Sequence, residues 1–440
     1  MRVAVIGAGW AGCAAAVEAT RRGCQVTLFE SARTPGGRAR RVSAALAGQP
    51  VALDNGQHIL IGAYAESLQL MTDLGVDVKA ALLRLPLTLQ FPDGSGLKLP
   101  PLAMPLPAPL DAFAGILTAR GWAWADKLSL LKVALGWQRN QFQCAPELSV
   151  SALCHGLTPG AMALLITPLC VSALNTPAER ASGQVFLRVL HDALFSASGG
   201  SNLLLPRVDL SALLPEAALA WLTEQASEQG SEKISAPRLG ARVRAIEPTA
   251  SGWVVTLDAS TTSRSFAFDA VVLACPAQEA ARLVDGSGVA ADDWLATTRS
   301  LQYEALTTVY AHSPGARLRQ PMLALPAAAA APAQFVFDRG QLGGPPGLLA
   351  FVISASSGDS ATLTRQVLAQ AASQLGLSGL QVVQTVVEKR ATFSCTPGLQ
   401  RPALRVAAGL LACGDYVDGP YPATLEGAVR SGLEAARCLR

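Results

Sequence analysis

Residues 2–12 read RVAVIGAGWAG, a short β-branched run that passes directly into a G-x-G-x-x-G motif. The run is typical of a buried parallel strand, and the glycines predict a tight turn into a helix. In this pattern Gly7 permits the turn, Gly9 lets a pyrophosphate approach the backbone, and Gly12 allows the helix to pack closely. The first amides of that helix, at Trp10 and Ala11, should face the phosphate.

The residues that follow complete a βαβ unit. A helix is expected through residues 13–19, ending near Gly23, and residues 25–30 (QVTLFE) form a second strand that ends in an acid. We expect Glu30, with its neighbour Ser31, to lie against the ribose of the nucleotide. This order of elements predicts a dinucleotide site rather than a glycine-rich turn that binds nothing. The acid disfavours a 2′-phosphate, and therefore NADP, but leaves NAD and FAD open.

Composition limits the remaining classes of protein. The chain has 440 residues, more than one hydrophobic core usually serves, so two domains are expected. Half of the residues are apolar, 15% are charged and the net charge is +3, which argues against a nucleic-acid partner. Nine cysteines without a Cys-x-x-Cys pair and four scattered histidines predict no metal site. We interpret the thiols as reduced, in a cytoplasmic protein without a membrane-spanning segment.

Two further segments carry a resemblance to a known superfamily. Residues 31–39 (SARTPGGRA) resemble the Gly-Gly-Arg signature of the amine oxidase and carotenoid desaturase flavoproteins. Residues 410–415 (LLACGD) and 423–432 (ATLEGAVRSG) look like the second FAD motif of the same superfamily. The resemblance implies FAD as the cofactor, with Asp415 on the ribityl chain and the amides around Leu425 near the flavin. It also assigns Gly37, Arg38, Gly414 and Thr424 to the cofactor site.

The middle of the chain extends the resemblance. Residues 269–276 (DAVVLACP) resemble the central strand of these enzymes, and residues 242–246 (RVRAI) resemble the strand whose backbone, at Val243, pairs with adenine. Residues 54–64 (DNGQHILIGAY) look like the plant-type phytoene desaturase branch. They bring Gln57 and His58 to the cofactor. Over its length the chain most resembles the squalene-associated flavoproteins of bacterial hopanoid synthesis, the hydroxysqualene dehydroxylases.

Two departures separate the chain from other members of the superfamily. Amine oxidases typically carry an aromatic residue two positions before the Glu of the C-terminal helix, where this chain has Thr424. The cysteine motif that attaches flavin covalently is also missing before that helix, and Cys413 would lie in the strand core. We therefore expect a non-covalent FAD and a substrate other than an amine.

The predicted fold is α/β, with a Rossmann-like FAD-binding domain of the glutathione-reductase type and an inserted α+β capping domain that binds the substrate. The FAD domain is predicted to be discontinuous, and the capping domain to comprise two insertions. The FAD domain takes residues 1–79, 208–291 and 396–440, and the capping domain takes 80–207 and 292–395.

The first insertion contains a proline-rich apolar stretch, residues 99–107, followed by a helical pattern with tryptophans and basic residues. Such a combination suits an interfacial segment, although the tryptophans could equally fill the core. We predict peripheral contact with the inner face of the cell membrane. The residues concerned are Trp122, Trp124, Trp137, Lys127, Lys132 and Arg139.

The resemblance implies reductive dehydroxylation of hydroxysqualene to squalene, with FAD performing the redox chemistry and a separate electron donor as partner. The protein would supply an apolar tunnel for the isoprenoid and an acid, for which His58 and Asp54 are the candidates. Each has a structural alternative, because His58 could only bond backbone and Asp54 could only cap a turn. Two rival functions remain: a carotenoid-type desaturase, and a non-catalytic FAD- or lipid-binding protein.

Overall fold

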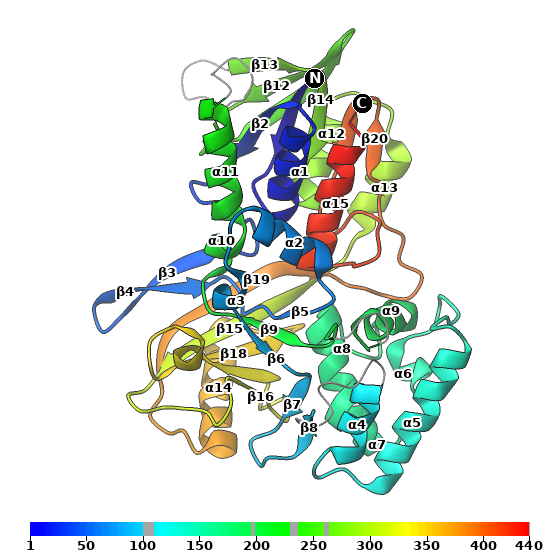
Figure 1. The fold of residues 1–440 in the computed structure, drawn as a ribbon, viewed down its shortest axis with the longest axis vertical. Coiled ribbons are helices and arrows are strands. Elements are labelled where there is room, and N and C mark those ends of the chain that lie inside the picture. The colour runs from blue at the N-terminus through cyan, green and yellow to red at the C-terminus, as the bar shows by residue number, and fades with distance from the viewer. Residues whose placement is uncertain (100–109, 195–198, 229–235, 259–263, 440) are drawn as a thin grey trace.

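The computed structural model describes residues 1–99, 110–194, 199–228, 236–258 and 264–439, so most of the proline-rich stretch lies outside the described residues. The molecule has two lobes, and both termini lie in the upper one (Figure 1). The upper lobe is built on a six-stranded sheet in the order β10-β2-β1-β14-β21-β20, parallel except for β20. Its strands are β1 (Arg2–Ile6), β2 (Gln25–Glu30), β10 (Arg238–Leu239), β14 (Ala270–Leu273), β20 (Arg405–Ala407) and β21 (Leu410–Ala412).

Helices cover this sheet and a small antiparallel sheet adjoins it. The central helix α1 (Trp10–Arg21) is buried over most of its length and packs on α15 (Leu425–Arg437) and α11 (Pro215–Glu228). A Cβ on Gly432 would lie 2.2 Å from the carbonyl oxygen of Ala11, so α1 and α15 touch backbone to backbone. The other elements are α2 (Ala65–Asp73), α10 (Leu210–Leu213), α12 (Ala277–Asp285), α13 (Asp292–Ser300), β11 (Val243–Thr249), β12 (Gly252–Leu257) and β13 (Arg264–Phe268).

The lower lobe contains an antiparallel sheet and a group of helices, which lie side by side in Figure 1. The sheet has the order β16-β17-β18-β15-β19, and its strands are β15 (Tyr303–His312), β16 (Met322–Ala324), β17 (Phe335–Asp338), β18 (Leu348–Ser354) and β19 (Gln381–Phe393). Helix α14 (Ser360–Leu375) packs on this sheet. The helical group comprises α4 (Leu110–Thr118), α5 (Trp124–Arg139), α6 (Val150–Leu153), α7 (Pro159–Ala161), the π-helix η2 (Met162–Ile166), α8 (Thr167–Leu174) and α9 (Gly183–Leu194).

Short strands connect the lobes. The sheet β5-β9-β6 pairs residues that follow the first βα unit with the segment returning from the helical group. These strands are β5 (Leu60–Ile61), β6 (Leu82–Leu85) and β9 (Leu203–Pro206), and the remaining elements are β3 (Arg41–Leu46), β4 (Gln49–Asp54), α3 (Val78–Ala81), β7 (Thr88–Gln90), β8 (Gly96–Lys98) and the 3-10 turn η3 (Arg339–Leu342).

The first βαβ unit forms as predicted. Both strands have the predicted bounds, and the helix ends at Arg21, just before Gly23, whose φ of +83° suits glycine. The segment 269–276 supplies β14, which lies between β1 and β21 in the sheet. The predicted α/β fold is therefore confirmed. Within the described part of the chain, no helix has the length and apolar character needed to cross a bilayer.

Candidate functional site

A cavity of about 810 Å³ lies where the two lobes meet, and residues from both lobes form its wall. Its volume falls at the large end of the range typical of ligand sites, ~300–1,000 Å³. Gly12 and Asp54 are not part of the wall, whereas the other predicted site residues are. Those in the wall are Gly7, Gly9, Trp10, Ala11, Glu30, Ser31, Gly37, Arg38, Gln57, His58, Val243, Gly414, Asp415, Thr424 and Leu425.

The glycine loop has the geometry that the motif predicts. Gly7 has a φ of +114°, and a Cβ there would lie 2.6 Å from the carbonyl oxygen of Ala274. A Cβ on Gly12 would lie 1.8 Å from the carbonyl oxygen of Gly7, so this glycine sits behind the loop and lets α1 approach it. Gly9, in contrast, has free space on its cavity side, where a Cβ would be 3.9 Å from the Cα of Gly37. The loop thus leaves bare backbone facing the cavity.

The acid at the end of β2 is held by backbone amides. The Glu30 carboxylate accepts hydrogen bonds from the amide of Ala8 at 2.7 Å and from the amide of Ala32 at 2.8 Å. The hydroxyl of Ser31 adds a third, at 3.2 Å. These bonds fix the carboxylate beside the glycine loop, the position from which an acid can accept a ribose hydroxyl.

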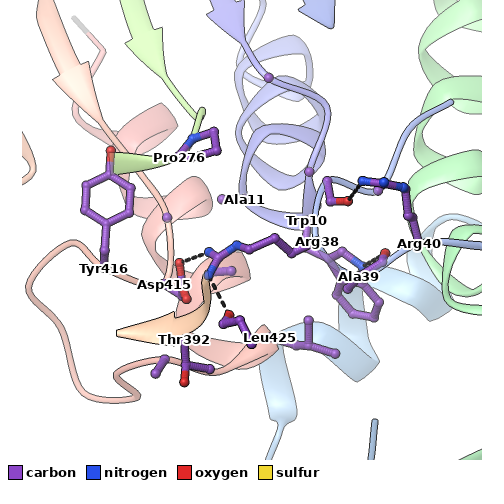
Figure 2. Close-up of a pocket in the computed structure, with 18 of the residues that line it drawn as sticks. Trp10, Ala11, Arg38, Ala39, Arg40, Pro276, Thr392, Asp415, Tyr416 and Leu425 are labelled. Atoms are coloured by element: carbon purple, nitrogen blue, oxygen red, sulfur yellow. Dashed lines mark hydrogen bonds and ion pairs between the residues drawn. The ribbon is translucent and has the colours of Figure 1, made fainter. Parts of the chain in front are cut away.

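Arg38 and Asp415 form an ion pair inside the cavity, although the chain separates them by 377 residues. Figure 2 shows the Arg38 side chain crossing the pocket to Asp415, with a second bond that its guanidinium donates to the carbonyl of Ala391 at 2.7 Å. Burial lowers the pKa of Arg38, but the charge and hydrogen bond of Asp415 outweigh it and raise the pKa above its ordinary value. The pair joins the Gly-Gly-Arg loop to the C-terminal motif.

A second helix N-terminus points at the same cavity. Thr424 is the N-cap of α15: its hydroxyl accepts a hydrogen bond from the amide of Gly427 at 2.9 Å and donates one to the carbonyl of Tyr421 at 3.0 Å. The hydroxyl is therefore occupied by capping. Ala423, just before the cap, has a φ of +58°, a strained value for a residue with a side chain. Leu425 begins the helix in the cavity wall, so its dipole favours negative charge there.

His58 lines the cavity and is held by one backbone bond. Its Nδ1 lies 2.6 Å from the carbonyl oxygen of Gly56, which can only accept, so Nδ1 carries the proton. Burial lowers the pKa of His58 below its ordinary value, with Arg38 acting in the same direction and the Gly56 bond opposing it. A neutral ring of this tautomer leaves Nε2 as a hydrogen-bond acceptor.

The structure does not bring Asp54 to the cavity with His58. Asp54 is 2% exposed, and its carboxylate accepts a hydrogen bond from the amide of Leu210 at 2.8 Å. Burial raises the pKa of Asp54 to about 6, against the lowering effect of that bond and of Arg339. The position does not support the prediction that Asp54 acts beside the flavin; this carboxylate instead helps to join β4 to α10.

Gln57 is oriented by a residue that the sequence analysis did not identify. Arg339 is 7% exposed and donates hydrogen bonds to the Gln57 side-chain oxygen at 3.4 Å and to the carbonyl of Pro206 at 3.2 Å. A guanidinium can only donate, so the amide oxygen must face Arg339. The other end, Nε2, is a buried donor without a protein partner within the described residues. This nitrogen has almost no accessible surface, so it points into the wall rather than into the open cavity.

The end of the cavity away from the glycine loop is apolar. Leu306, Phe335, Phe337 and Val352 come from three adjacent strands of the five-stranded sheet and form part of the wall. Helix α8 contributes Ala173 and the hydroxyl-bearing residue Ser172 to the wall. These residues lie far from any of the sequence motifs, and the sequence analysis did not identify them.

Comparison with known proteins identifies the family. The family described as flavin containing amine oxidoreductase matches residues 10–440. The chain belongs to this family. It is 29% identical to a hydroxysqualene dehydroxylase of Rhodopseudomonas palustris, over 99% of this chain and 97% of that protein.

Solved structures share the fold at low sequence identity. An oxidoreductase from Methanosarcina mazei has a TM-score of 0.71 at 16% identity, with 99% of this chain and all of that one covered. A cyclohexylamine oxidase from Brevibacterium oxydans has a TM-score of 0.69 at 15% identity, with 99% and 98% covered. The protein is thus a flavin-containing oxidoreductase, and the resemblance found in the sequence is confirmed.

The residues of the cavity fit a flavin nucleotide. The bare backbone at Gly9 and Gly37 and the fixed acid at Glu30 supply the contacts that a pyrophosphate and a ribose need. No cluster of three or more potential metal ligands occurs among the described residues.

Proposed function

We propose that this protein is an FAD-dependent oxidoreductase that replaces an allylic hydroxyl of hydroxysqualene by hydrogen and releases squalene. The main support is one cavity whose wall combines the backbone of the glycine loop with apolar side chains from the five-stranded sheet. The similarity to a hydroxysqualene dehydroxylase over nearly the whole of both chains supports the substrate. We retain the glutathione-reductase subtype of the FAD domain and the predicted domain boundaries as part of this proposal, except that α13, which was predicted to belong to the capping domain, lies in the upper lobe (Figure 1).

FAD is expected to bind without a covalent bond. Gly9 and the first turn of α1 would hold the pyrophosphate, Glu30 the ribose, and Val243 the adenine. Cys275 is the cysteine in the cavity wall, and burial raises its pKa to about 12, which suppresses the reactive thiolate. Cys413 is fully buried, as expected, but it lies directly after β21 rather than within the strand. Neither cysteine is suited to attack a flavin.

A bound reduced flavin would supply a hydride for the allylic carbon, and the oxygen would take up one proton from the solvent and leave as water. Arg38 and Asp415 neutralise each other, so the pair adds little net charge to the site. The positive end of α15, beginning at Leu425, favours the anionic form of a reduced cofactor. The apolar residues of β15, β17 and β18 exclude water from the isoprenoid.

We assign a role in substrate binding to His58. A hydroxyl group donates one hydrogen bond and accepts up to two. The unprotonated Nε2 of His58 can accept the bond from a substrate hydroxyl. Because burial keeps His58 neutral, we propose that it orients the hydroxyl rather than protonating it.

The proposal can be tested with the holoprotein under anaerobic conditions. The flavin is photoreduced, hydroxysqualene is added in detergent, and the flavin absorbance is followed while the lipid is extracted for mass analysis. Flavin reoxidation with formation of squalene is the expected result. A flavin that stays reduced and yields no squalene would contradict it. Reduction of the oxidised protein by a polyene would instead support a desaturase, and redox inertness towards both would support a binding protein.

A further inference from the structure

Exposed large apolar side chains gather on two consecutive helices of the lower lobe. Ten such side chains are exposed among the described residues, and five of them fall between residues 110 and 135. The remainder are spread over the molecule. Scattered exposed apolar residues are normal, but a concentration of them marks an interaction surface. We call the five the α4–α5 patch: Leu110, Leu117, Trp124, Leu128 and Leu135.

The outward face of α5 combines apolar and basic residues. Trp124 is 67% exposed and Leu128 is 60% exposed, although both are large and apolar. Lys132 and Arg139 are exposed on the same helix, at spacings of four and seven residues that keep them on this face. The single acid of α5, Asp126, does not pair with these basic residues. Its carboxylate accepts hydrogen bonds from the Thr158 hydroxyl at 2.6 Å and from the Ala123 amide at 3.1 Å.

A buried lysine joins the two helices of the patch. The ammonium of Lys127 donates a hydrogen bond to the carbonyl of Leu117 at 2.8 Å and lies 5.1 Å from the centre of the Trp124 ring. These contacts fix the end of α4 against the start of α5. The tryptophans predicted to be interfacial divide: Trp122 is buried, Trp137 is half-buried, and Trp124 alone of the three is exposed.

We propose that the α4–α5 patch docks the protein on the surface of a bilayer that contains anionic lipids. Trp and Leu side chains can enter the headgroup region while Lys132 and Arg139 contact lipid phosphates. A second copy of this chain is a poorer occupant. A symmetric contact would bring the basic residues of both copies into one interface, where the acid of α5 is already engaged and these charges repel.

The position of the patch suits this role. Helices α4 and α5 lie in the lower lobe, at the opposite end of the molecule from the two termini (Figure 1). The same helical group contributes α8 to the cavity wall. If the proposed function holds, docking would place this side of the cavity near the bilayer in which an isoprenoid dissolves. The docking itself does not depend on the reaction.

The test is co-sedimentation of the FAD-loaded protein with two kinds of vesicle, pure phosphatidylcholine and an equal mixture with phosphatidylglycerol. We expect preference for the anionic vesicles. Trp124→Ser with Leu128→Ser should lower binding to them about tenfold or more, because buried apolar area is lost. Lys132→Gln with Arg139→Gln should lower it about twentyfold and abolish the preference.

Matched controls use exposed residues elsewhere. Val382→Ser with Val387→Ser, on β19, and Arg317→Gln with Arg319→Gln should leave vesicle binding unchanged. All variants should retain their flavin and their turnover of detergent-dispersed substrate, which separates this test from that of the proposed function. Vesicle binding that is absent, or equal in wild type and patch variants, would overturn the proposal. So would a wild-type dimer that Leu128→Ser converts to a monomer.

Discussion

The two halves of the cavity are built from different materials. The nucleotide half is made of backbone: glycines at positions 7, 9 and 37, the amides that hold Glu30, and the first turns of two helices. The apolar half is made of side chains from β15, β17 and β18, which the chain supplies from a different lobe. Backbone contacts leave no room for an added side chain, whereas the side chains of the apolar wall can be replaced one at a time. A substitution in the nucleotide half should therefore abolish flavin binding, and a substitution in the apolar half should only weaken substrate binding.

The largest expected effect is in the nucleotide half. Gly12→Ala would place a Cβ 1.8 Å from the carbonyl oxygen of Gly7 and 3.0 Å from the Cβ of Ala274. Because the closest atom belongs to backbone, α1 must move away from the loop, and we expect purified protein without flavin. The flavin absorbance per polypeptide measures this. Gly136→Ala is the matched control, since nothing lies within 4 Å of its Cβ. A Gly12→Ala protein with full flavin content would show that the nucleotide half does tolerate an added side chain.

Asp54 tests whether a residue outside the cavity wall contributes to stability rather than to turnover. Its pKa is raised from 3.8 to about 6, so folding favours its protonated form, and the destabilising effect of its charge grows as pH rises from about 4 to about 6 and is constant above that. Asp54→Asn keeps an acceptor for the Leu210 amide and removes the buried charge. We expect it to stabilise the protein by about 3 kcal/mol above pH 6 and by nothing below about pH 4. Denaturant unfolding at several pH values measures this, and lost turnover at unchanged flavin content would return Asp54 to the list of catalytic candidates.

His58 marks the boundary between the halves. His58→Ala should lower turnover about tenfold to a hundredfold, because a hydrogen bond to the substrate hydroxyl is lost, while flavin content stays the same. His58→Gln should recover part of the loss, since its side-chain oxygen can accept the same bond. Single-turnover reoxidation of the flavin reports both rates. Equal rates in His58→Ala and wild type would remove this residue from the site.

The Arg38–Asp415 pair tests how tightly the two sequence motifs are coupled. Arg38→Met leaves the nearly buried Asp415 carboxylate without its positive partner, and Asp415→Asn leaves the Arg38 guanidinium without its negative partner. Each change should lower stability by about 2 kcal/mol, less than a fully buried pair would lose because Arg38 is one-third exposed. The double variant should cost less than the sum of the two. Additive losses in a double-mutant cycle would show that the pair is not coupled.

The smallest effect is expected in the apolar half. Val352→Thr changes little in volume but adds a hydroxyl, and burying it unpaired costs about 1–2 kcal/mol. The KM for the isoprenoid should therefore rise about fivefold to thirtyfold, with flavin content and spectrum unchanged. A loss of flavin instead would show that this wall belongs to the nucleotide half.

The same difference explains what could be predicted from the sequence. Gly7, Gly9, Gly12 and Glu30 act through local backbone geometry, so their spacing within one βαβ unit was sufficient to place them. The resemblance assigned Arg38 and Asp415 to the same cofactor site, but it did not predict their ion pair, because nothing local joins residues so far apart.

The apolar wall and Arg339 could not be predicted. A strand such as β17, with the sequence FVFD, reads the same whether Phe337 faces a core or a cavity. Arg339 follows this strand and reaches Gln57 only because the lower sheet packs against residues 54–58, a contact set by tertiary structure. For Asp54, proximity in sequence to His58 was misleading, since adjacent segments can face opposite sides of a wall.

The central claim is that one cavity holds the flavin in its backbone-lined half and the isoprenoid in its apolar half. A crystal structure of the protein with FAD and squalene tests it most directly. We predict the flavin ring beside the N-terminus of α15 and the hydrocarbon chain against Leu306, Phe337 and Val352. A hydrocarbon chain bound elsewhere, with these three residues in contact only with protein or flavin, would contradict the account.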